Sequence, residues 1–347
     1  MTVILSDDIS INLTKTKGVN MKLKKSFLIL AVCAMFAIPL FAEDENSSNP
    51  VQYSIGVDFA FYPKWTKVGT GTQTDVLRFA EFGGIYNNLE GRVNLDASYT
   101  IPTPLGEHWL LSGANVNVNE RLELTPVSIA PSTTISFTPL PFIVFQSGVK
   151  LGTGWDFGSI FRGGMSAYNG SSYEALGAFT NLYSKYWIQG TFQFDTGAII
   201  SGDWTHVQMM YTYQTYYEGL TGVRAQQPWA WQCTDNKVNG LQEYQQVILA
   251  YGMPLVLSRV GLIWESERYY SDNVYANSAF KASMPIYNLS AMAQLKFTQK
   301  DTLTVLANFA SRRTYAVYDS NIPESELTTT GAEWYFRRIA FNYTHNF

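Results

Sequence analysis

Three histidines, His108, His206 and His345, are the side chains that titrate near neutral pH and could act as a general acid or base. Catalysis by a histidine needs a nucleophile or a substrate proton within hydrogen-bond reach, and a metal site needs several ligands together. The three histidines are far apart in the sequence, and His206 follows Asp203 by three residues. We expect a hydrogen bond between His206 and Asp203. We also expect no catalytic residues, no metal site and no cofactor.

Charged side chains form a second group, and they recur at every other position of otherwise apolar segments. In the clearest segment, Glu90, Arg92 and Asp96 alternate with Val93 and Leu95. A period of two residues is the period of a β-strand. In a membrane barrel one face of each strand meets lipid and the other faces the lumen, and charges belong to the lumen face. This alternation predicts a strand with a polar inner face and an apolar outer face.

The composition supports the same fold class. Aromatic residues make up 15% of the chain and charged residues only 15%, whereas soluble domains have about 25% charged residues. The mean hydropathy is −0.07, and beyond the N-terminal region no apolar run reaches the roughly 20 residues of a spanning helix. Alternating strands explain both facts, because the mean hydropathy stays near zero while one face is continuously apolar. We expect an all-β, transmembrane, antiparallel up-and-down β-barrel.

Alternating segments follow one another along the chain, with connections that alternate between short and long. We expect about twelve strands, between 10 and 14, because boundaries read from sequence drift by a few residues. The expected strands are 51–62, 89–101, 109–118, 121–137, 142–155, 183–198, 204–217, 241–251, 256–270, 283–297, 302–317 and 333–347. The short turns should face the periplasm and the long loops the outside. An even number of strands closes such a barrel without free edges.

Aromatic residues are concentrated near the expected strand ends. Tyr and Trp side chains prefer the interface between membrane and water. We therefore expect girdles of aromatic side chains that include Trp109, Trp155, Tyr183, Tyr186, Tyr270 and Phe297.

An export signal is expected near the N-terminus. Met21 is followed by three lysines, and the apolar run 27–42 comes directly after them, which is the layout of a secretory signal peptide. We expect translation to start at Met21 and cleavage to follow Ala42. The expected organisation is a mis-assigned N-terminal extension, a signal peptide, a short periplasmic segment and a transmembrane barrel, at residues 1–20, 21–42, 43–50 and 51–347.

Two other interpretations of the apolar run stay open. A transmembrane anchor would need roughly 20 residues, and the run has sixteen. A lipoprotein signal would place a lipid on Cys33, but Val32 stands where a small residue is usual. Once the signal is removed, Cys233 has no cysteine partner within its own chain, and pairing between chains stays open.

The last residues of the chain have strand periodicity. Ile339, Phe341, Tyr343 and the terminal Phe347 share one face of the expected final strand. Such an ending resembles the last strand of Gram-negative outer-membrane barrels, although an edge strand of a soluble sheet could have the same alternation. The resemblance implies the outer membrane of a diderm bacterium. It also implies that Phe341, Tyr343 and Phe347 form the signal recognised by the barrel-assembly machinery.

The same family of barrels includes enzymes, which gives a test of the histidines. The phospholipase barrels carry a nucleophilic serine two residues after a histidine. In this chain Leu110, Gln208 and Phe347 occupy those positions. The sequence therefore does not match their Ser-His pair, and we do not expect an enzyme.

The remaining candidate site is the lumen. Strand parity assigns charged residues of both signs to its wall, and opposed acidic and basic side chains would favour small hydrophilic solutes. The alternative is a barrel that is plugged by its own salt bridges and loops. The expected lumen-lining charges are Asp58, Glu90, Arg92, Asp96, Glu123, Lys150, Asp195, Arg259, Glu265, Glu267, Lys296, Arg312 and Arg338.

Three functions follow from these features. The first is a porin-like channel for small hydrophilic solutes, and the second is a non-conducting barrel whose long surface loops bind a partner or another cell. The third is an outer-membrane enzyme. The expected partners are outer-membrane lipid, the barrel-assembly machinery and small hydrophilic solutes. A net charge of −4 gives no basic surface for nucleic acid, and the oligomeric state stays open.

Overall fold

A computed structural model of the chain describes residues 51–63, 89–156, 164–232, 234–319 and 322–347. The expected extension, signal peptide and periplasmic segment, together with Cys33 and Cys233, lie outside the described residues. Among the described residues, no helix is long and apolar enough to cross a membrane.

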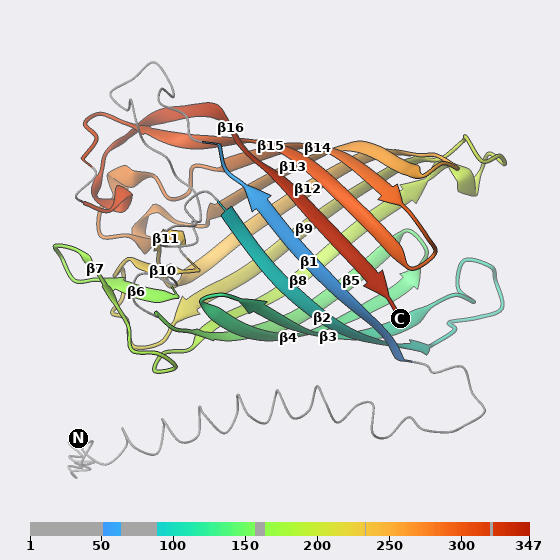
Figure 1. The fold of residues 1–347 in the computed structure, drawn as a ribbon, viewed down its shortest axis with the longest axis horizontal. Coiled ribbons are helices and arrows are strands. Elements are labelled where there is room, and N and C mark those ends of the chain that lie inside the picture. Colours follow the sequence, from blue (N-terminus) through green and yellow to red (C-terminus); the bar gives the residue numbers. More distant parts are fainter. Residues whose placement is uncertain (1–50, 64–88, 157–163, 233, 320–321) are drawn as a thin grey trace, which may run out of the picture. The chain divides into compact units, whose positions relative to one another are not determined.

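Twelve antiparallel strands of the described residues form a closed barrel (Figure 1). Each strand pairs with the next barrel strand along the chain, and the last pairs with the first. The all-β, up-and-down fold and the expected number of strands are therefore confirmed. The strands are β1 Val51–Phe61, β2 Leu89–Pro102, β3 Asn115–Thr125, β4 Ser128–Leu140, β5 Ile143–Gly154, β8 Tyr183–Asp195, β9 Val207–Leu220, β12 Gly240–Gly252, β13 Leu257–Tyr269, β14 Ile286–Lys296, β15 Asp301–Tyr315 and β16 Thr329–Asn346.

The C-terminal strand closes the barrel. β16 pairs with β1 from Ser54 opposite Asn346 to Phe61 opposite Ile339. The backbone N–H of Phe347 continues this pairing and donates to the carbonyl of Tyr53 at 3.0 Å. Closure satisfies the backbone groups that a sheet edge would leave unpaired.

The alternation of residues along each strand separates the two faces of the barrel. In β1, Val57, Phe59 and Phe61 are 42–44% exposed on the outer surface, whereas Gly56 and Ala60 on the other face are buried. Successive side chains of a strand point to opposite faces, so the residues between the outer apolar ones point into the barrel. We call this second set inward-facing.

The boundary between β3 and β4 differs from the expected strands 109–118 and 121–137. The chain turns at Pro126 and Val127, and β3 runs unbroken up to this turn. Proline is favoured at the second position of a tight turn because its φ is already fixed there. The Thr125 hydroxyl also accepts a hydrogen bond from the Val127 N–H at 3.2 Å, which stabilises the turn.

The connection 103–114 is longer than expected. The N–H of Thr103 donates to the carbonyl of Ala114 at 2.9 Å, and the N–H of Leu111 donates to that of His108 at 2.8 Å. Trp109 therefore lies in this turn and is 71% exposed. The expectation that a strand begins at Trp109 is wrong, because local turn hydrogen bonds replace the strand ladder there.

The barrel has two different ends. The turn end carries connections 103–114, 141–142, 196–206, 253–256 and 297–300, and the opposite loop end carries the connections that include the long loops. At the loop end lies a four-stranded sheet in the order β11-β10-β6-β7 (Figure 1). The short elements are β6 Met165–Tyr168, β7 Tyr173–Ala175, β10 Trp229–Trp231, β11 Thr234–Lys237, and the 3-10 helices η3 Thr196–Ala198, η4 Asp272–Val274, η5 Ser278–Phe280 and η6 Glu324–Glu326.

The small sheet packs against the inward-facing side of the barrel wall. Trp231 of β10 stacks on Tyr183 of β8, with ring centroids 4.5 Å apart and planes 7° apart. Gly152 of β5 makes room for this ring, because a Cβ there would lie 2.8 Å from it. Tyr183 is therefore buried inside the barrel, and the expectation that it joins an outer aromatic girdle is wrong.

Candidate functional site in the barrel lumen

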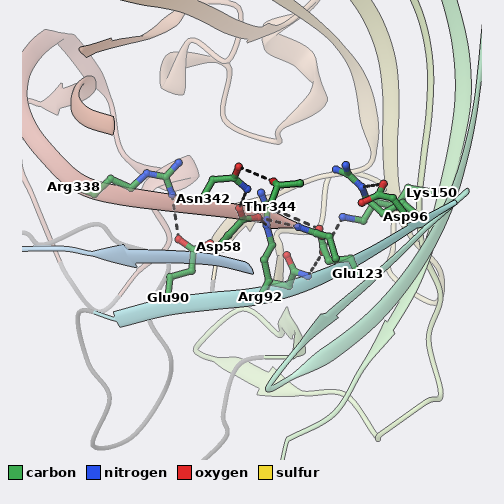
Figure 2. Close-up of polar contacts among 12 residues, drawn as sticks. Asp58, Glu90, Arg92, Asp96, Glu123, Lys150, Arg338, Asn342 and Thr344 are labelled. Carbon is green, nitrogen blue, oxygen red and sulfur yellow. Dashed lines mark hydrogen bonds and ion pairs between the residues drawn. The ribbon is translucent and has the colours of Figure 1, made fainter. Parts of the chain in front are cut away.

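A network of ion pairs lines one side of the lumen, on β16, β1, β2, β3 and β5 (Figure 2). Asp58 of β1 accepts hydrogen bonds from the Nε of Arg92 and from Asn342, and from Nδ2 of Asn94 at 3.0 Å. Arg92 also reaches Glu123 of β3 at 3.3 Å. The carboxylate of Asp58 therefore lies within a network that joins three strands and β16.

Glu123 extends this network in two directions. It accepts from Nζ of Lys150 on β5 at 2.8 Å and from Nε2 of Gln232, which follows β10, at 2.8 Å. Only 5% of the Glu123 side chain is exposed. A buried carboxylate needs such partners because its desolvation is otherwise costly. Glu123 thus joins the barrel wall to the small sheet of the loop end.

Two further pairs complete this side. Arg121 donates to Asp96 at 2.7 Å, and Arg338 donates to Glu90 at 3.1 Å, where Tyr62 also donates to Glu90. The register explains the contacts, since Asp96 stands directly opposite Arg121. Opposite charges across neighbouring strands stabilise a sheet. We call this side the charged wall, formed by Asp58, Glu90, Arg92, Asp96, Arg121, Glu123, Lys150 and Arg338.

The inner faces of β9 and β12 to β15 carry apolar side chains beside their charged ones. Apolar side chains face inward there, and β8 with its neighbours adds a row of glutamines. Gln189 donates to Gln146 at 2.6 Å and Gln214 donates to Gln189 at 2.8 Å. We call the apolar set the apolar wall, formed by Met210, Ile248, Ala250, Ile263, Met292 and Leu306.

Asp195 and His206 form a pair near the turn end. Nδ1 of His206 lies 3.0 Å from Oδ1 of Asp195, and Gln208 donates to the other carboxylate oxygen at 2.8 Å. The expected partner Asp203 lies instead at the cavity of this end. The pairing of His206 with Asp203 was therefore wrong, because the hairpin that joins β8 to β9 brings Asp195 across to His206.

Arg259 and Lys296 do not join the charged wall. Both line a cavity of about 540 Å³ at the turn end, together with His206, Gln208 and Gln294. Arg259 also lines a second cavity of about 580 Å³, which is largely apolar. Within the described part of the chain, no carboxylate lies within 4.0 Å of the charged group of Arg259 or Lys296.

The remaining predicted residues lie elsewhere on the inner wall. Glu265 accepts from the Tyr244 hydroxyl at 2.6 Å, and Arg312 forms an ion pair with Glu333 on β16 at 2.5 Å. Glu267 accepts from the Tyr216 hydroxyl. The structure therefore brings Asp58, Glu90, Arg92, Asp96, Lys150 and Arg338 along one wall, and leaves Asp195, Arg259, Glu265, Lys296 and Arg312 apart from it.

The ion pair between Glu218 and Lys237 at the loop end was not predicted from the sequence. Nζ of Lys237 lies 3.0 Å from both carboxylate oxygens of Glu218. Burial lowers the pKa of Lys237, but the Glu218 and Glu267 carboxylates more than offset this, and the net shift is upward. The parity of β9 would assign Glu218 to the inner face, since it matches that of Gln208 and Gln214. No sequence signal shows that β11 folds back onto it.

The outer surface carries the predicted C-terminal aromatic residues. Phe341, Tyr343 and Phe347 are exposed, as the alternation of β16 requires. His345 lies 2.8 Å from Asp301 through its Nδ1 and packs edge-on against Phe347. Towards the loop end, Tyr287 packs against Trp264 and stacks on Trp334.

No cluster of three or more His, Cys, Asp or Glu side chains that could hold a metal ion is found among the described residues.

Several solved structures are similar to this chain in fold. An outer-membrane channel from Pseudomonas putida F1 is 9% identical, with a TM-score of 0.45 over 88% of this chain and 99% of that one. The β-domain of the Bordetella autotransporter BrkA is 8% identical, with a TM-score of 0.41 over 86% and 100%. The KdgM porin in complex with oligogalacturonate is 8% identical, with a TM-score of 0.35 over 85% and 99%.

No protein-family model matches the chain, and no curated protein does.

Proposed function

We propose that this chain is an outer-membrane β-barrel that acts as a porin-like channel for small hydrophilic solutes. The observation that carries the proposal is the opposite chemistry of the two barrel faces. Apolar side chains such as Val57, Phe59 and Phe61 cover the outside, and the ion pairs of the charged wall lie inside.

The two faces suit two different solvents. A charge on the lipid side of a barrel strand costs about 2 to 4 kcal/mol at the bilayer centre, so the apolar outside suits a membrane. Charges of both signs in a lumen hold water and interact with polar solutes as they pass. The turn end would face the periplasm and the loop end the outside. These features support a membrane-embedded barrel with a hydrated lumen.

Single-channel recording tests this function. Residues 43–347 are refolded into a planar bilayer, and a heat-modifiable gel shift certifies that the barrel has formed. We expect stepwise conductance that changes when Glu90 or Arg92 is replaced by glutamine. Leu95→Val is the matched control, since Leu95 lies on the same strand with its side chain on the outer surface, and its conductance should match the native value. A folded but silent barrel would contradict the channel.

A second function is favoured by the packing at the loop end. There Val238, Tyr275, Phe280 and Leu327, from three different loops, form a buried cluster with Tyr315, the last residue of β15. Packed loops of this kind could restrict the lumen and serve as a binding surface, with the barrel as an anchor. Deletion of residues 272–281, which removes Tyr275 and Phe280 from this cluster, separates the two functions. A channel keeps or raises its conductance, whereas an anchor stays silent and loses binding to its partner.

The C-terminal residues are proposed to guide assembly. Phe341, Tyr343 and Phe347 lie exposed on the closing strand, where the barrel-assembly machinery could bind before closure. Deletion of Phe347 in cells should lower the amount of folded barrel in the outer membrane without changing its conductance.

A further inference from the structure

Two inward-facing cations at the turn end face a cavity without an acidic partner. Arg259 of β13 lies opposite Gln294 of β14, and Lys296 is two residues further along the same face of β14. Both line the cavity of about 540 Å³. Neither forms an ion pair with any of the described carboxylates. In contrast, Lys150 and Arg338 on the charged wall each contact a carboxylate.

Polar groups that suit an anion surround these cations. Gln294 and Gln299 line the same cavity, and their amides can donate hydrogen bonds, whereas the Nε2 of Gln208 already donates to Asp195. Asp203 is the carboxylate among the lining residues, so the two cations outnumber it. Asp195 nearby is already engaged, because it accepts hydrogen bonds from Gln208 and from the N–H of Gly197.

The adjoining cavity is apolar. It measures about 580 Å³, and its lining is largely apolar, with Leu110, Phe142, Met210 and Ile248, but it also includes Asp195. Arg259 and Gln208 line both cavities, so the charged and the apolar parts meet at Arg259. Ligand sites of this size are usually apolar with a few polar groups that set the orientation of the ligand.

We propose that the turn end binds an amphiphilic carboxylate, whose head lies at Arg259 and Lys296 and whose hydrocarbon body lies against Leu110, Phe142, Met210 and Ile248. An arginine can hold a carboxylate through two parallel hydrogen bonds, and a lysine adds a point charge. A small inorganic anion would leave the apolar cavity unused, and a neutral hydrocarbon would leave the cations without a partner. The site goes beyond the proposed channel, because it can bind whether or not the barrel conducts.

Calorimetric titration of octanoate tests the site. The folded protein is placed in phosphatidylcholine nanodiscs, and empty nanodiscs serve as the blank. We expect saturable binding of octanoate, with acetate and octanamide each at least tenfold weaker, since one lacks the body and the other the charge. Arg259→Gln and Lys296→Gln should each weaken octanoate binding about tenfold, in line with the strength of charge-assisted hydrogen bonds. Lys300→Gln, in the adjoining turn, is the matched control and should leave the affinity unchanged.

Other results would overturn the proposal. No octanoate binding to the native protein, equal affinity for octanamide, or equal affinity for acetate would each do so. An unchanged affinity in folded Arg259→Gln and Lys296→Gln would also contradict the site. If one of these variants does not fold, the comparison of octanoate, octanamide and acetate on the native protein still decides. None of these readouts depends on conductance, so a silent barrel can still pass or fail them.

The source of the carboxylate is a separate outcome. Mass spectrometry of an organic extract of the purified protein shows whether a fatty acid is retained. A fatty acid that the native protein keeps and the Arg259→Gln variant loses marks membrane lipid as the source. Octanoate binding without a retained lipid marks a soluble organic acid. Both results support the site and assign its ligand.

Discussion

The loop end and the turn end of the barrel differ in whether their cations are paired with a carboxylate of the chain. At the loop end, Lys237 is paired with Glu218, and Trp231 is stacked on Tyr183. At the turn end, Arg259 faces two cavities, and no described carboxylate lies within 4.0 Å of its guanidinium. The cation at the loop end is therefore partnered by a carboxylate of the chain, and the cation at the turn end is not.

This difference indicates which charged side chains affect the stability of the fold and which ones serve to bind a ligand. A buried charge depends on its partner, and loss of that partner alone is costly. A charge at a cavity without a partner adds little to stability, so its position is better explained by a ligand. The loop end should therefore respond to mutation through stability, and the turn end through binding.

The largest change in the free energy of unfolding is expected for a tryptophan at the loop end, compared with a tryptophan at the turn end. Trp231 is 4% exposed, so Trp231→Ala leaves a cavity and should lower the free energy of unfolding by about 3 kcal/mol. Trp109 at the turn end is 71% exposed, and Trp109→Ala should change it by less than about 0.5 kcal/mol. Urea titration of the protein in lipid vesicles measures both. Equal effects of the two substitutions would remove the contrast.

The ion pair of Lys237 and Glu218 gives the next comparison. Lys237→Met leaves the buried Glu218 without its cation and should lower the free energy of unfolding by about 2 kcal/mol. Lys237 is partly exposed, which keeps the loss below that of a fully buried pair. The double variant Lys237→Met with Glu218→Met should regain most of this loss, since it removes both charges together. Additive losses in the double variant would show that the two side chains are not coupled.

The pH dependence of the free energy of unfolding gives a second test of the ion pair between Lys237 and Glu218. The pKa of Lys237 is raised from its ordinary value of 10.5 by the Glu218 and Glu267 carboxylates, which outweigh its burial. A raised pKa means that the charged form stabilises the fold fully below pH 10.5, and that this contribution is lost as pH rises through the higher folded pKa. The stability difference between native protein and Lys237→Met should therefore shrink above pH 10.5 in urea titrations. A constant difference up to pH 12 would argue against the ion pair.

The smallest change in the free energy of unfolding is expected for the two cations at the turn end. Arg259→Gln and Lys296→Gln should each change the free energy of unfolding by less than about 0.5 kcal/mol, because neither leaves a described carboxylate without its cation. The same urea titrations measure this change. A loss as large as that of Lys237→Met would assign these cations to the fold rather than to a ligand.

The strand pattern predicts the barrel and the two faces of its strands. A period of two residues decides on which face of the sheet each side chain lies. It places Asp58 and Arg92 on one face and Phe59 on the other. The strand number follows from the same alternation. These features are local, so a single strand carries the information that they require.

Contacts between distant segments were not predictable in the same way. His206 pairs with Asp195 rather than Asp203, and Tyr183 faces Trp231 rather than lipid. Both contacts depend on how a hairpin or a loop folds back, which periodicity does not describe. The turn at Pro126 was misplaced for a different reason, since the alternation continues on both sides of a tight turn and masks it.

The contrast between the two ends leads us to propose that the lumen is accessible from the turn end, where Arg259 and Lys296 line a cavity, and is restricted by the packed loops of the buried cluster at the other end. Polymer exclusion in a planar bilayer tests it most directly, with small polyethylene glycols added to one side at a time. Polymer on the turn side should enter and lower the conductance, whereas polymer of the same size on the loop side should not. An equal response from both sides would contradict the difference between the two ends.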